Sequence, residues 1–86
     1  MQVREELQKL IDGLATQRDE LIVKAHLAKL EAQDEWRELE SKLAELRAKA
    51  QQAAEVAGEA AEEVRAAARL LAEEIGRGYE RLKRLF

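Results

Sequence analysis

The chain has 86 residues, of which 47% are hydrophobic, 38% are charged and 3% are aromatic, and its formal net charge is −3. A chain of this length forms one small domain at most, and its modest core argues against an enclosed active site. The absence of cysteine excludes disulfides and thiolate metal sites. The bias toward alanine, glutamate, lysine, leucine and arginine is typical of coiled coils and long helices. We therefore expect residues 1–86 to form a single all-α unit.

The N-terminal part of the chain carries a regular apolar stripe. Val3, Leu7, Leu10, Leu14 and Leu21 are separated by polar residues at steps that fit one face of a helix. This spacing predicts an amphipathic helix over the first 21 residues.

The phase of the stripe changes between residues 21 and 39. Small or apolar residues follow each other there at successive steps of four, which predicts a stutter that locally relaxes a left-handed supercoil. A second apolar set, Val23, Leu27 and Leu30, lies away from the main stripe. A two-stranded coiled coil would leave this second set in water, so we expect the N-terminal half to meet more than one neighbour.

The central part of the chain keeps a strict alternation of three and four residues from Trp36 to Leu71, which indicates a coiled coil. Its middle is lined almost entirely by alanine, which allows close helix packing but removes little apolar area from water. We call the whole predicted contact surface the self-association seam. It consists of Leu7, Leu10, Leu14, Leu21, Trp36, Leu39, Leu43, Leu46, Ala50, Ala53, Ala57, Ala60, Val64, Ala67 and Leu71.

Gly58 decides between two architectures. The heptad pattern passes through it unshifted and no proline, asparagine or serine stands nearby, which favours a long coiled-coil helix that is continuous or bent near Gly58. Such a helix would be about 130 Å long. The alternative is a break at residues 56–60 and a two-helix antiparallel hairpin, because glycine in a helix interior costs about 1 kcal/mol and often ends a helix. In that hairpin, residues 60–85 fold back over residues 30–55.

The C-terminal segment 75–86 is basic and amphipathic. It contains one acid, Glu80, and four bases, Arg77, Arg81, Lys83 and Arg84. These bases either complement the negative end of a helix, which is the favoured interpretation, or bind an acidic surface such as a membrane. Nucleic-acid binding would need a longer basic stripe, so we do not expect it.

The residues that could carry chemistry lack the neighbours that chemistry requires. His26 has no metal ligand one helical turn away, since position 22 is isoleucine and position 30 is leucine. Adjacent carboxylates such as Glu62 and Glu63 need a cleft that perturbs their pKa values before they can act as acid and base. We therefore expect no enzymatic activity, no cofactor, no metal and no small-molecule substrate.

Two stretches carry a resemblance to a protein family. They are "KAHLAKLEAQDEWRELESKLAELRAKA" at residues 24–50 and "LLAEEIGRGYERLKRLF" at residues 70–86. The chain resembles small bacterial coiled-coil proteins that are uncharacterised or stress-associated. This resemblance implies a long first helix, an alanine- and glycine-rich middle, an amphipathic C-terminal helix and no catalytic residues.

The sequence thus predicts a non-enzymatic structural or interaction protein that associates with its own copies or with another helical protein, in a stress-related setting that the resemblance implies. The alternative is a protein that binds a membrane or lipid surface through its basic C-terminal segment. No apolar run approaches the roughly 20 residues that span a bilayer. The start, "MQVREELQKL", has acids where a signal peptide would be basic and apolar, so we expect a cytoplasmic location.

Overall fold

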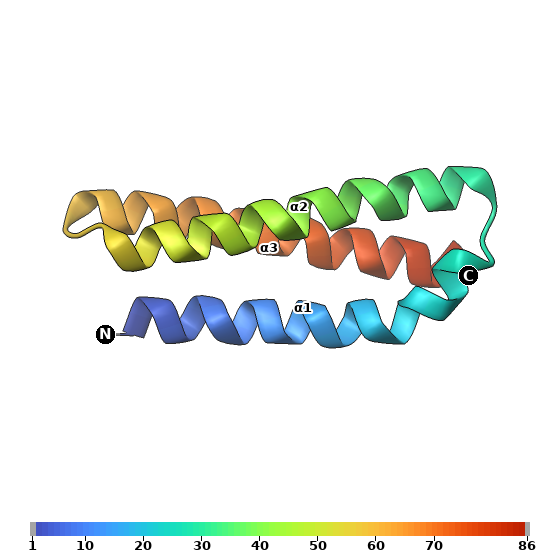
Figure 1. Cartoon of the computed structure of the whole chain (residues 1–86), viewed down its shortest axis with the longest axis horizontal. Coiled ribbons are helices and arrows are strands. Elements are labelled where there is room, and N and C mark those ends of the chain that lie inside the picture. Colours follow the sequence, from blue (N-terminus) through green and yellow to red (C-terminus); the bar gives the residue numbers. More distant parts are fainter. Residues whose placement is uncertain (1, 86) are drawn as a thin grey trace.

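A computed structural model of the chain describes the backbone of residues 2–85 and the side chains of residues 5–85. It contains three helices, α1 (Gln2–His26), α2 (Leu30–Glu55) and α3 (Glu59–Leu85). The helices run up, down and up beside one another and form a bundle of 45 × 18 × 16 Å (Figure 1). The all-α prediction is confirmed. Phe86, the last residue of the basic segment, lies outside the described residues.

The first turn, at residues 27–29, replaces the predicted stutter. The backbone N–H of Leu27 donates to the carbonyl of Lys24 over 3.1 Å, which closes the end of α1. The Gln33 side chain in the first turn of α2 donates to the carbonyl of Ala28 over 2.9 Å, which ties the turn to the start of α2. No glycine or proline marks this turn. The change of phase in the apolar pattern is therefore the point at which the chain reverses direction.

The second turn lies at residues 56–58 and corrects the preference for a continuous helix. Gly58 has a φ of +68°, which lies in the left-handed region that glycine adopts without steric cost. Its carbonyl accepts the backbone N–H groups of Ala61 and Glu62, which belong to the first turn of α3. The chain therefore turns back within residues 56–60, at the break of the alternative architecture, instead of forming a rod. Helices α2 and α3 pack antiparallel, and α1 covers the pair (Figure 1).

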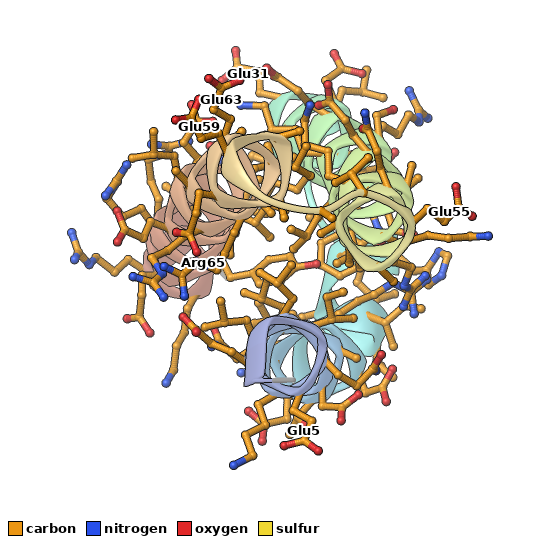
Figure 2. The ribbon with its side chains drawn as sticks, turned by 90° about the vertical axis from the view of Figure 1, so that its left-hand side faces the viewer. Glu5, Glu31, Glu55, Glu59, Glu63 and Arg65 are labelled. Carbon is orange, nitrogen blue, oxygen red and sulfur yellow. The ribbon has the colours of Figure 1, made fainter. Side chains whose placement is uncertain are left out.

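One apolar core fills the space between the three helices. It consists of Leu7, Ile11, Leu14, Leu21, Ala25, Ala32, Trp36, Leu39, Leu43, Leu46, Ala53, Ala68, Leu71, Ala72, Ile75, Tyr79 and Leu82. Burial of these side chains is the main term that holds the bundle together. Figure 2 looks along the bundle and shows the side chains of the three helices meeting in its centre.

Each pair of helices is also joined by an ion pair. Arg18 on α1 donates two hydrogen bonds to Glu40 on α2, over 2.5 and 2.9 Å. Arg81 on α3 donates to Glu35 on α2 over 2.6 Å. Helix α3 also contacts α1 through Arg65 and Arg69, which both pair with Glu6. Partly exposed pairs contribute little energy each, but they fix how the helices align along their length.

Candidate interaction surface

Most residues of the predicted self-association seam lie inside the bundle. The leucines at positions 7, 14, 21, 39, 43, 46 and 71, together with Trp36 and Ala53, are buried by the other helices of the same chain. Leu10, Ala50 and Val64 are half-buried and pack against this core. The structure therefore places these twelve residues in contact within one copy of the chain.

Three alanines of the seam are exposed. Ala57 and Ala60 lie at and just after the turn between α2 and α3, and Ala67 lies on the outer side of α3. The neighbouring Ala68 is buried in place of Ala67. The phase of α3 is set by Ile75 and Leu82, whose large side chains gain more from burial than an alanine does.

Exposed leucine and valine side chains gather at one end of the bundle. Leu27 begins the turn between α1 and α2 and Leu30 follows it, and they are 84% and 74% exposed. Val23 in the last turn of α1 and Leu85 at the end of α3 are also largely exposed. This end lies opposite the turn between α2 and α3 (Figure 1). We call Val23, Leu27, Leu30 and Leu85 the apolar end.

A hollow of about 570 Å³ opens at the apolar end. Ala28 and Ala32 lie at the hollow beside the exposed leucines, and their small side chains leave room there. Leu27 and Leu85 line it from two different segments of the chain. The remaining lining residues are charged, namely Lys24, Lys29 and Glu31. The hollow thus offers apolar contact beside two bases and one acid.

The four bases of the C-terminal segment are all exposed on α3. Arg81 is held by Glu35 of α2, so it is not free to bind another acid without losing this ion pair. Lys83 and Arg84 stand in the last turn of α3, next to Leu85, and complement the negative end of the helix dipole. The apolar face of this segment, formed by Ile75, Tyr79 and Leu82, is buried in the core.

The opposite end of the bundle is acidic. Residues 55–63 contain Glu55, Glu59, Glu62 and Glu63 and no base. Figure 2 looks onto this end, where Glu55, Glu59 and Glu63 point outward, as does Glu5 from the first turns of α1. Acids in the first turn of α3 complement the positive end of its dipole. This end therefore contrasts with the apolar end, where Lys24 and Lys29 line the hollow.

Tyr79 is the most polar group in the core. Its side chain is buried against Trp36, with ring centroids 5.8 Å apart, and its hydroxyl has no hydrogen-bond partner among the described residues. Burial, helped by the negative charge of Glu40, raises the pKa of Tyr79 to about 12. The cause is that the phenolate would lose its hydration in the core.

This raised pKa predicts a loss of stability in alkaline solution. The unfolded chain releases the tyrosine proton near pH 10.0 and the folded chain near pH 12, so the folded state holds more protons between these values. The free energy of unfolding is unaffected by this group below pH 10.0 and falls by about 2 kcal/mol as the pH rises to 12. Denaturant unfolding at several pH values measures the loss. A Tyr79→Phe variant should lack this component, and an equal alkaline loss in that variant would contradict the assignment to Tyr79.

The residues considered above for chemistry do not come together at one site. His26 and Glu63 are exposed, and Glu62 pairs with Arg65. Trp36 is a core residue, as its place in the heptad indicates. Within residues 5–85, no cluster of three or more histidine, aspartate or glutamate side chains is arranged to hold a metal ion. None of the helices, as far as they are described, has a stretch that is long and apolar enough to cross a membrane.

Comparison of the chain with protein-family models, with curated proteins and with solved structures found no match. The surface of the bundle is therefore the basis for assigning a function.

Part of the apolar end can be predicted from the sequence, because Val23, Leu27 and Leu30 form the second apolar set, which lies away from the main stripe. The place of Leu85 in the apolar end cannot be predicted from the sequence. Leu85 comes near the other three residues only because the two turns bring the end of α3 beside the first turn.

Proposed function

We propose that the chain is a non-enzymatic interaction protein that binds its partner through the apolar end of a folded three-helix bundle. The observation that carries this proposal is a hollow that Leu27 and Leu85 line beside two lysines, at the end of the bundle where Val23 and Leu30 are exposed as well. Exposed apolar residues that stand singly need no explanation, but a contiguous group with a polar rim is typical of an interaction site. Association between copies of the chain, where it occurs, would also use this end, because the leucines of the seam are engaged in the core.

A dye that is both apolar and anionic tests this surface. Anilinonaphthalene sulfonate should bind the folded protein and gain fluorescence, because the hollow offers leucine side chains next to Lys24 and Lys29. A variant with Leu27→Ser and Leu30→Ser should lose most of this signal. Both residues are exposed, so their replacement should change the stability of the bundle by no more than about 0.5 kcal/mol each.

Leu70→Ser is the matched control for the dye experiment. Leu70 is 63% exposed but lies in the middle of α3, away from the apolar end. Its replacement should leave dye fluorescence unchanged. The proposal would be contradicted if the Leu27 and Leu30 variant bound the dye as well as the wild type, or if the Leu70 variant lost the signal to the same degree.

The stress-related setting is a further part of the proposal and rests on the resemblance to small bacterial coiled-coil proteins. A cytoplasmic location is likewise proposed from the charge pattern of the first residues.

A further inference from the structure

We infer that the apolar end docks, end-on and fully folded, on a lipid surface that carries negative charge. This inference rests on the proposed function, since it names the partner of the same end. Segments 24–29 and 83–85 contain Lys24, Lys29, Lys83 and Arg84 and no acid. The hollow that Lys24, Lys29 and Leu85 line together brings the two segments side by side.

The combination of apolar tips and surrounding bases fits an anionic bilayer. Leucine side chains insert at the boundary between head groups and acyl chains, while lysine and arginine bind the phosphates. Leu27, Leu30 and Leu85 are the side chains that would insert. The hollow itself carries two bases, Lys24 and Lys29, and one acid, Glu31, while Lys83 and Arg84 stand beside Leu85 in the last turn of α3.

The acidic end gives the bundle a preferred orientation on such a surface. Glu55, Glu59, Glu62 and Glu63 lie at the far end of a molecule 45 Å long, beyond the roughly 8 Å over which physiological salt screens charge. An anionic surface therefore attracts one end and repels the other. A second copy is less favoured as the partner of the same end, because two apolar ends in contact would bring together the eight bases of these segments with only the two Glu31 side chains at the hollows.

This arrangement differs from binding by a basic amphipathic helix at residues 75–86. The apolar face of that segment is buried against α1 and α2, and Tyr79 packs on Trp36. Binding through that face would require α3 to leave the bundle. End-on docking leaves the core closed, so the fluorescence emission of Trp36 should not shift when the protein binds lipid.

Co-sedimentation with vesicles tests the inference. The full chain should bind vesicles of phosphatidylglycerol mixed with phosphatidylcholine, and bind vesicles of phosphatidylcholine alone far more weakly. A Lys24→Gln and Lys29→Gln variant should bind the anionic vesicles about 25-fold more weakly, since each base near the surface contributes about fivefold. The Leu27→Ser and Leu30→Ser variant should lose about tenfold or more.

A second pair of lysines provides the control. Lys9→Gln and Lys49→Gln make the same change in net charge on α1 and α2, in the half of the bundle nearer the acidic end. This variant should bind within about twofold of the wild type, because its lysines stay away from the surface. Equal losses in the two lysine variants would overturn the inference, since they would indicate attraction by net charge alone.

The remaining outcomes separate this inference from the proposed function. If the wild type fails to sediment with anionic vesicles while the dye signal still depends on Leu27 and Leu30, the lipid inference is wrong and the proposed interaction surface stands. If light scattering then shows a mass that rises with concentration and falls back in the Leu27 and Leu30 variant, the partner is a second copy. If neither dye nor vesicles depend on these leucines, both the inference and the proposed function are wrong.

Discussion

Replacing Leu46 by alanine is expected to lower the free energy of unfolding by about 3 kcal/mol. Leu46 is fully buried, so the substitution removes apolar contacts and leaves a cavity that neighbouring side chains fill only in part. A domain of this size has a total stability of roughly 4–13 kcal/mol. The melting temperature should fall by about 12–24 °C. Thermal and denaturant unfolding measure the change directly.

Leu70→Ala is the control for this prediction. It makes the same chemical change on α3 at a side chain that is 63% exposed, and should alter stability by no more than about 0.5 kcal/mol. The mass in solution should be the same for both variants and the wild type, because Leu46 packs within its own chain. A change of mass with little change of stability in Leu46→Ala would instead place Leu46 at a contact between copies.

Replacing Gly78 by alanine is expected to destabilise the bundle by about 1–2 kcal/mol, although alanine is the better helix former by about 1 kcal/mol. A Cβ atom at Gly78 would lie 2.9 Å from Cδ1 and 3.2 Å from Cγ of Leu39 on α2. Leu39 is buried among other core side chains and has little room to retreat. The overpacking therefore outweighs the gain in helix propensity.

Gly76→Ala should have the opposite sign and serves as the control. Gly76 stands in the same helix, and a Cβ there would meet only Leu14 Cδ2, at an ordinary contact distance of 3.9 Å. Alanine at this position should stabilise the protein by about 0.5–1 kcal/mol. Urea unfolding of the two variants compares them directly, and a stabilising Gly78→Ala would show that α2 and α3 do not approach closely at Leu39.

The effect of Gly78→Ala should depend on Leu39. In a Leu39→Ala background the added methyl group no longer meets the leucine side chain, so the cost of Gly78→Ala should disappear. The coupling between the two substitutions measures their contact, since residues that share a contact do not add independently. Additive effects would indicate that the destabilisation arises elsewhere.

The sequence predicts much of this fold because the core follows helical spacing. The stripe through Leu39, Leu43 and Leu46 is buried, as a heptad pattern requires. Gly58 lies in the turn between α2 and α3, where the sequence allows a break as the alternative to a continuous helix. Glycine weakens a helix, yet α3 continues through both Gly76 and Gly78. Gly78 is explained by the approach of Leu39, which only the folded chain makes visible.

Two features could not be read from the sequence, for physical reasons. The turn at residues 27–29 contains no glycine or proline and forms because packing of α1 on the other helices outweighs helix propensity there. The heptad pattern places Ala67 in the seam, but alanine stands at positions 66, 67 and 68, and only the larger residues further along determine that Ala68 is the one buried. The apolar end was visible in part through Leu27 and Leu30, while its completion by Leu85 depends on both turns.

Small-angle X-ray scattering combined with light scattering tests most directly whether the apolar stripe folds the chain back on itself and leaves one end as the interaction surface. At low concentration, a mass near 9.8 kDa is expected, with a radius of gyration close to the 13.9 Å of the Cα atoms. A continuous helix about 130 Å long would instead have a radius of gyration of roughly 37 Å. That larger value, together with a mass above the monomer, would place the leucine stripe between copies of the chain and contradict the folded bundle.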